Sequence, residues 1–229
     1  MTPIKLVAFD LDGTLVDSAS DIARAVDRAL LELGQRTYGV EEVKGWVGEG
    51  LSKLLKRALT GELDGEPDPA LLQRCREQFS RFYKEGLCVD TRFYPGALEM
   101  LETLARRYRL ACITNKAAEY TEPLLKTLGV RERFDVVVSG DTLKALKPDP
   151  APLLYAASHL SLDPVHCCMV GDSRNDILAA KAAGFRAVAV SYGYRQGVDL
   201  LALGAETELD SLAELVPWLE GLDSLAASR

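Results

Sequence analysis

The sequence predicts an α/β protein, a Rossmann-like doubly wound parallel sheet into which an all-helical domain is inserted. Two observations support this prediction. Short, almost wholly apolar runs alternate with amphipathic helical patterns through most of the chain, as in parallel strands that helices cover on both faces. One long interval, at about residues 16–92, interrupts the alternation and contains helical patterns alone.

Five apolar runs have the composition of buried parallel strands, and helical patterns lie between them. The strands are expected at residues 4–9, 109–114, 135–139, 167–170 and 186–190. The helices are expected at residues 96–108, 118–128, 151–160 and 176–183. Gly129 and Gly184 follow two of these helices, where chains often turn through a left-handed residue.

The interval between the first two strands is interpreted as a separate helical domain. Apolar residues recur there at helical spacing in three sets, and we expect Trp46, Phe79 and Phe82 in its core. The boundaries predict an α/β core made of residues 1–15 and 93–229, and a helical domain made of residues 16–92.

Composition argues against several classes of function. The formal net charge is −7, whereas nucleic-acid-binding surfaces are usually basic. No apolar run reaches the ~18 residues of a membrane span, and the first residues do not resemble a secretory signal. The five cysteines form no C-x-x-C pair, which favours reduced thiols. We therefore expect a cytoplasmic protein that binds neither nucleic acid nor a membrane.

Polar residues follow the ends of four predicted strands. Open α/β sheets bind ligands at the carboxyl ends of their strands, so these residues are expected to meet at one edge. Lys147 follows the third strand after a short connection. The strand-end groups are Asp10 with Asp12, Thr114 to Lys116, Ser139 to Asp141, and Asp172 with Ser173.

Asp10 and Asp12 are two residues apart and are followed by Gly13. Alternate positions of a strand share a face, and Gly13 allows backbone angles that other residues avoid, so both carboxylates can reach one pocket. A divalent cation would offset their repulsion, and oxygen ligands favour Mg²⁺ over zinc. Aspartate is also common in turns, so the pair alone leaves a purely structural role open.

The string VAFDLDGTLVD at residues 7–17 resembles the first signature of the haloacid dehalogenase superfamily. The resemblance continues in order through residues 113–115, 147–149 and 170–177, and it covers the whole chain. It implies a Rossmann-like core, a helical cap inserted after the first strand, and Mg²⁺-dependent hydrolysis of a phosphate monoester.

The resemblance also implies roles for individual residues. Asp10 would be the nucleophile that becomes an aspartyl-phosphate. Asp12 would protonate the leaving oxygen and then activate water. Thr114, Asn115 and Lys147 would bind the phosphoryl group, and Lys147 would also offset the charge of the nucleophile.

The metal site follows from the same resemblance. The carboxylates of Asp10 and Asp172 and the backbone carbonyl of Asp12 would hold Mg²⁺. Asp176 would orient Lys147 or the waters of the metal, with Ser173 beside it.

Some of these residues have an alternative, structural explanation. Thr114 and Ser173 could cap the helices that follow them, and Asp176 could be an acid in the first turn of a helix. Lys144 is close in sequence and competes with Lys147 for its role.

Two short segments indicate a subfamily. Residues 46–51, with Gly48 and Gly50, and residues 192–197 are similar to segments of bacterial phosphoglycolate phosphatases. The two glycines could donate backbone hydrogen bonds to a small substrate, or simply separate two helices. The expected reaction is hydrolysis of 2-phosphoglycolate to glycolate and phosphate.

Other functions stay open. One alternative is a phosphatase acting on a sugar phosphate, N-acetylmuramic acid 6-phosphate or a nucleotide. A second is a β-phosphoglucomutase-like mutase, and a third is a non-catalytic protein that keeps the fold. Haloacid dehalogenases do not need an acid at the position of Asp12, so its presence favours phosphate chemistry. The expected ligand is a small phosphorylated metabolite, and the expected assembly is a monomer or a homodimer.

Overall fold

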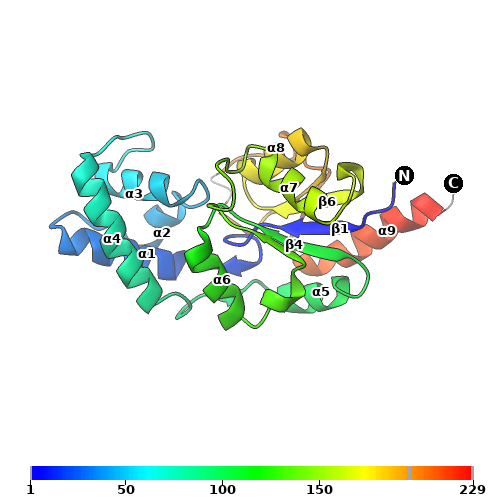
Figure 1. Ribbon diagram of the computed structural model, residues 1–229, viewed down its shortest axis with the longest axis horizontal. Helices are drawn as coiled ribbons and strands as arrows, with labels where there is room; N and C mark the ends of the chain where they lie inside the picture. Colours follow the sequence, from blue (N-terminus) through cyan, green and yellow to red (C-terminus); the bar gives the residue numbers. More distant parts are fainter. Residues whose placement is uncertain (1, 195–196, 228–229) are drawn as a thin grey trace.

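The computed structural model describes residues 2–194 and 197–227. Figure 1 shows two parts side by side, a group of helices from the first half of the chain and a parallel sheet between further helices. The chain leaves the sheet after its first strand, builds the helical part and then returns. Within the described ranges, no helix has both the length and the apolar composition required to cross a bilayer.

In the described part of the chain the sheet has six strands in the order β5-β4-β1-β6-β7-β8, and all neighbours are parallel. This order confirms the doubly wound sheet, because strands are added on both sides of β1. The sequence prediction did not include strand β8, which is a correction. Two of its three residues are only half-buried, so the strand has no apolar run that would have predicted it. The strands are β1 (Leu6–Phe9), β4 (Arg109–Ile113), β5 (Val136–Val138), β6 (Cys167–Gly171), β7 (Arg186–Val190) and β8 (Thr207–Leu209).

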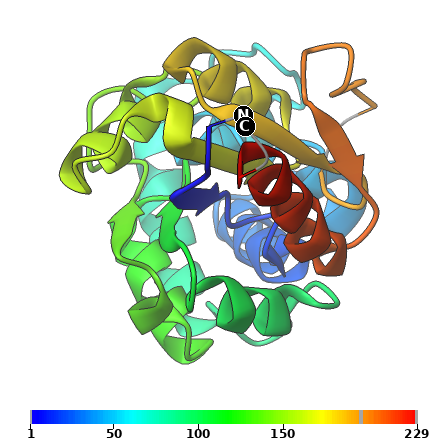
Figure 2. The ribbon, with the colours of Figure 1, turned by 90° about the vertical axis from the view of Figure 1, so that its right-hand side faces the viewer.

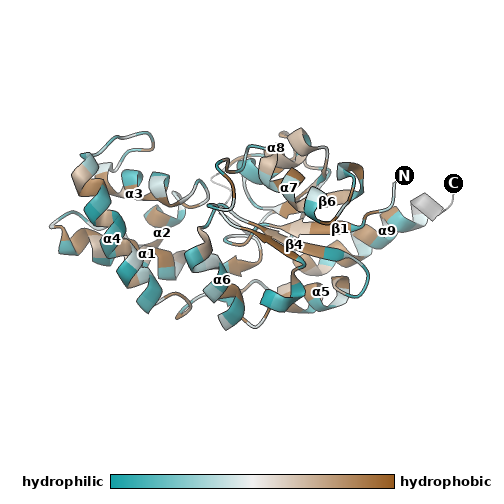
Figure 3. Cartoon of the chain, viewed as in Figure 1, coloured by the Kyte–Doolittle hydropathy of each residue, from teal (hydrophilic) through white to brown (hydrophobic). Residues whose placement is uncertain are grey.

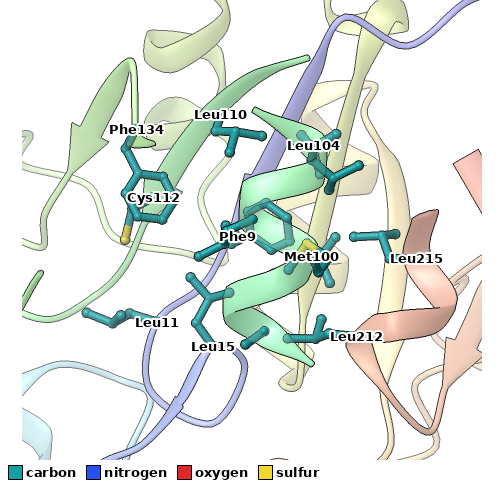
Figure 4. Packing of buried hydrophobic residues seen from close by; sticks show 14 of the residues in the cluster. Phe9, Leu11, Leu15, Met100, Leu104, Leu110, Cys112, Phe134, Leu212 and Leu215 are labelled. Atoms are coloured by element: carbon teal, nitrogen blue, oxygen red, sulfur yellow. The ribbon is translucent and has the colours of Figure 1, made fainter. Parts of the chain in front are cut away.

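Side chains of the central strand β1 enter two hydrophobic layers alternately. Val7 and Phe9 pack in the first layer, and Leu6 and Ala8 pack in the second. Figure 4 shows Phe9 beside Met100 of helix α5 in the first layer. Because both faces are buried, the strand has an apolar sequence without alternation.

Helices cover both faces of this sheet, as the end-on view in Figure 2 shows. The first layer contains residues of α5 (Ala97–Leu104), α6 (Ala118–Thr127) and α9 (Leu215–Ala227). The second layer contains residues of α7 (Ala151–His159) and α8 (Arg174–Ala183). Short 3-10 helices are present at η1 (Arg131–Arg133), η2 (Pro164–His166) and η3 (Leu212–Glu214). Helix α9 was not among the predicted helices, although Leu215 and Leu219 have helical spacing and are buried.

Four helices form the other part of the molecule. They enclose a third hydrophobic cluster that contains Trp46, Phe79 and Phe82, which confirms these residues as core of the helical unit. Polar and apolar segments alternate along the helices in Figure 3, as expected when each buries one face. The helices are α1 (Ala19–Glu32), α2 (Gly39–Lys44), α3 (Leu51–Thr60) and α4 (Pro69–Glu85).

A two-stranded ribbon joins the helical unit to the sheet. Its strands β2 (Val16–Asp17) and β3 (Arg92–Phe93) are antiparallel. The sequence predicts no strand from about residue 16 to 92, so this ribbon is a correction. Two residues per strand are too few to show an alternating pattern. Asp21 of α1 braces the ribbon, because its carboxylate accepts hydrogen bonds from the N–H groups of Asp90 and Thr91.

Candidate active site

The carboxyl ends of three adjacent strands bring Asp10, Thr114 and Asp172 to one edge of the sheet. Strand β1 lies between β4 and β6, and each of these residues directly follows its strand. All three residues are buried, with exposed fractions of 7%, 5% and 1%. Residues from three of the four predicted strand ends are therefore brought together in the structure.

Gly13 allows the turn after β1 to approach Asp172. Its φ is +90°, a conformation that residues with a Cβ rarely adopt. A Cβ at this position would lie 2.4 Å from Oδ2 of Asp172. The next residue, Thr14, donates its hydroxyl hydrogen bond to Oδ1 of Asp172 at 2.7 Å. The turn thus holds Asp172 against the end of β1.

Lys147 connects two of the buried carboxylates. Its Nζ lies 3.0 Å from Oδ1 of Asp10 and 2.7 Å from Oδ1 of Asp176, and it donates to the carbonyl of Ile113 at 2.5 Å. Burial lowers the pKa of this ammonium, but the two carboxylates outweigh burial and raise it. Lys147 therefore stays charged beside Asp10, whereas the competing Lys144 is exposed.

Asp10, Asp172 and Asp176 form a cluster suited to a cation. Each offers an oxygen, and these oxygens lie within 4.8 Å of one another. Burial, with the charge of Asp176 adding to it, raises the pKa of Asp10 to about 7 although Lys147 lowers it. Burial and the neighbouring carboxylates raise the pKa of Asp172 to about 8. A bound cation would relieve this repulsion.

The hydrogen bonds divide the cluster into two kinds of carboxylate. Oδ1 of Asp10 is buried and, apart from its ion pair with Lys147, accepts no hydrogen bond from the described residues. Asp176 accepts from Lys147 through Oδ1 and from Ser173 through Oδ2. These contacts fit a divalent cation on Asp10 and Asp172, with Asp176 behind Lys147. Ser173 and Asp176 also form a capping box at the start of α8.

Asn115 ties three loops together beside the site. Its Nδ2 donates to the carbonyls of Lys147 and Gly48, both at 2.9 Å, and its Oδ1 accepts from the N–H of Lys147 at 3.0 Å. The side chain of Asn115 thus positions Lys147, and the contact of Asn115 with the phosphoryl group stays a prediction. The hydroxyl of Thr114 accepts from the N–H of Lys116 at 3.2 Å.

Asp12 contacts a cation to which the sequence analysis gave no role. Lys116 Nζ lies 2.9 Å and 3.0 Å from the two carboxylate oxygens of Asp12. The hydroxyl of Ser18 donates to Oδ1 of Asp12 at 2.5 Å. A lysine directly after the strand-end pair Thr114-Asn115 is the sequence signal that could have identified Lys116.

A cavity of about 60 Å³ lies between the sheet edge and the helical unit. Asp10, Asp12 and Lys116 line its sheet side, and Gly48 and Gly50 line it from the helical unit. The helical unit contacts the core here through the carbonyl of Gly48, which accepts from Asn115 at 2.9 Å. Both glycines therefore lie beside the cavity.

The segment at residues 192–197 contacts both the site and the ribbon. The N–H of Tyr194 donates to Oδ2 of Asp172 at 2.6 Å. Its hydroxyl donates to Asp17 at 2.8 Å and accepts from the N–H groups of Ser18 and Ala19. Residues 195–196 of this segment lie outside the described residues.

Comparisons with known proteins identify the relatives of this chain. Residues 7–190 match the family of haloacid dehalogenase-like hydrolases. The chain is 48% identical over 213 residues to a phosphoglycolate phosphatase of Nitrosospira multiformis, covering 93% of this chain and 94% of the relative. It is 43% identical over 212 residues to a phosphoglycolate phosphatase of Nitrosococcus oceani, covering 92% and 94%.

A solved structure has the same architecture. The crystal structure of a predicted phosphoglycolate phosphatase from Haemophilus somnus has a TM-score of 0.88 and 34% sequence identity, and the match covers 95% of this chain and 98% of that chain. The chain belongs to the haloacid dehalogenase-like hydrolase family. Within that family it is a phosphatase enzyme.

Proposed function

We propose that this protein is a Mg²⁺-dependent phosphatase that hydrolyses 2-phosphoglycolate to glycolate and phosphate through an aspartyl-phosphate on Asp10. The observation that carries the proposal is the position of Asp10 at the wall of a small cavity, with Lys147 Nζ 3.0 Å from its carboxylate. The relatives named phosphoglycolate phosphatase support the choice of substrate.

In the first step, a carboxylate oxygen of Asp10 bonds to phosphorus as the bond from phosphorus to the ester oxygen breaks. Lys147 and the hydroxyl of Thr114 offset the charge on the phosphoryl oxygens. Asp12 gives its proton to the ester oxygen, which leaves as the hydroxyl of glycolate.

In the second step, water attacks the phosphorus of the aspartyl-phosphate. The ionised Asp12 accepts the proton of this water. The bond between phosphorus and Asp10 breaks, which releases phosphate and restores the carboxylate. Asp176 holds Lys147 in place throughout, through the hydrogen bond of 2.7 Å.

The proposed metal ligands are the carboxylates of Asp10 and Asp172 and the backbone carbonyl of Asp12. Magnesium, when bound, would neutralise charge on the phosphoryl group and on the carboxylate cluster. Thr14 and the N–H of Tyr194 fix both oxygens of Asp172, which orients this carboxylate for the cation.

We assign the catalytic core to residues 1–15 and 93–229 and the cap to residues 16–92. The cavity between them measures about 60 Å³. Since one water requires ~10–15 Å³ of such space, this volume suits a substrate of few atoms better than a nucleotide. Gly48 and Gly50 are assigned to the part of the cap that meets the substrate. A cytoplasmic location and a monomer or homodimer remain predictions.

The experiment is phosphate release from a panel of esters with Mg²⁺, with EDTA as the control. The panel contains 2-phosphoglycolate, β-glucose 1-phosphate, a nucleoside monophosphate and N-acetylmuramic acid 6-phosphate. A large preference for 2-phosphoglycolate that EDTA abolishes is the expected result. Preference for another ester would overturn the substrate, and activity that survives EDTA would overturn the metal. Conversion of glucose 1-phosphate to glucose 6-phosphate without phosphate release would indicate a mutase.

A further inference from the structure

Lys116 is a buried cation that the proposed mechanism does not use. Its side chain is 7% exposed, and it lines the cavity at the junction of core and cap. Its Nζ lies 5.0 Å from the ring centroid of Tyr83, which belongs to cap helix α4. A charged group in this position is costly to bury unless it is paired and hydrogen-bonded.

The known partner of Lys116 leaves room for another. Its Nζ contacts both oxygens of Asp12, but an ammonium has three N–H donors. The hydroxyl of Tyr83 also interacts with this ammonium but lies outside hydrogen-bond geometry, so the third donor can turn to an acceptor in the cavity. In a buried site of low effective dielectric, such a bond to an anion is stronger than in water.

The surroundings of the cavity indicate an anion at this place. The phosphoryl end of the substrate belongs at Asp10 and Lys147. Much of the remaining lining is apolar and includes Ile22, Leu51 and Leu54. Among the described residues that line the cavity, Lys116 is the basic one. A second negative group on the substrate finds its counter-charge there.

The chemistry of the leaving group sets how far this anion lies from phosphorus. Asp12 must reach the ester oxygen to protonate it, and Lys116 directly contacts Asp12. A substrate group that contacts Lys116 therefore lies on the same side of the cavity as the ester oxygen, where a short connection between the two fits. A carboxylate on the carbon that bears the ester oxygen satisfies this condition.

We propose that Lys116 binds the carboxylate of the substrate and selects phosphate esters that carry a carboxylate on the ester-bearing carbon. This inference rests on the proposed function and assigns its substrate specificity to one side chain. Asp12 shares Lys116 with the substrate, so the ammonium contacts both the side chain of Asp12 and the substrate carboxylate when the substrate is bound.

The test compares two esters that differ only in this group. Wild type and Lys116→Met are assayed with Mg²⁺ on 2-phosphoglycolate and on ethyl phosphate, which has a methyl group in place of the carboxylate. Lys144→Met is the matched control, because Lys144 is an exposed lysine. Circular dichroism checks that each variant is folded. Should the methionine variant fail to fold, Lys116→Gln, which keeps a hydrogen-bond donor for Asp12, replaces it.

The expected result is a selective loss. Lys116→Met should raise KM for 2-phosphoglycolate and reduce its kcat/KM about tenfold to a hundredfold more than that for ethyl phosphate, as when a hydrogen bond to a charged group is removed. Lys144→Met should leave both esters unchanged.

Other outcomes overturn one proposal or both. Equal losses on the two esters would mean that Lys116 acts only through Asp12, and unchanged kinetics would mean that it has no role. Either result refutes this inference. The proposed function is still upheld in that case if the wild type prefers 2-phosphoglycolate. A wild type without that preference refutes the proposed function and this inference together.

Discussion

Replacing Lys147 by methionine tests the buried charge arrangement directly. The ammonium lies within 3.0 Å of Asp10 and 2.7 Å of Asp176, and its side chain is 2% exposed. Methionine has a similar length, so the main effect is electrostatic: two buried carboxylates lose their shared counter-charge. Removing one partner of a buried ion pair costs about 3–5 kcal/mol. Because Asp10 can take up a proton, we expect the lower end, about 3 kcal/mol, in metal-free protein.

The assay is thermal unfolding followed by circular dichroism near neutral pH with EDTA. A loss of about 3 kcal/mol lowers the Tm of a chain of this size by about 6–12 °C. The double variant Lys147→Met with Asp176→Leu should lose less, because it leaves one fewer buried carboxylate. Lys144→Met, from the exposed part of the same loop, is the control. A Tm equal to that of the control would refute the reasoning, because the three charges would then not be coupled.

Three further predictions concern the same edge of the sheet. Asp10→Asn should reduce phosphate release to background while Mg²⁺ still raises the Tm through Asp172, and undiminished turnover would rule out Asp10 as the nucleophile. The pKa values of Asp10 and Asp172 are raised to about 7 and about 8, so folded metal-free protein holds protons that the unfolded chain releases. Their contribution to the free energy of unfolding should be full below about pH 4 and be lost as the pH rises to about 8. Unfolding measured against pH with EDTA should show this decline, and Mg²⁺ should reduce it. Identical pH profiles with and without Mg²⁺ would contradict the metal site. Gly13→Ala should lower stability by about 1–3 kcal/mol and weaken Mg²⁺ binding in calorimetry, because its Cβ meets Asp172. Gly34→Ala, with φ +67° and no neighbour within 4 Å, should show only the backbone effect.

The sequence indicated where the candidate site residues lie better than it indicated which of them contact one another. Asp10 and Asp172 follow apolar runs, and strand ends of a parallel sheet meet at one edge, so their proximity could be inferred. The choice between Lys147 and Lys144 could not be made from spacing, because both belong to one connection. Burial of Lys147 and exposure of Lys144 separate them.

The contact between Lys116 and Asp12 shows why other features were missed. The two residues are 104 positions apart, and they meet only because β4 and β1 are neighbours in the sheet. Strand order is a property of the whole fold, and no local pattern records it. The ribbon formed by β2 and β3 was missed for the opposite reason, since its two-residue strands are too short to leave a pattern.

The same ribbon joins the helical unit to the core at one place. Both connections of this unit pass through paired strands, so its two ends lie side by side. The parallel sheet takes none of its strands from the helical unit. Insertions, deletions or replacement within α1 to α4 can alter the roof of the cavity without moving a strand of the core. Such changes would reshape the part of the cavity lined by the helical unit, while Lys116 and the reacting residues stay in the core.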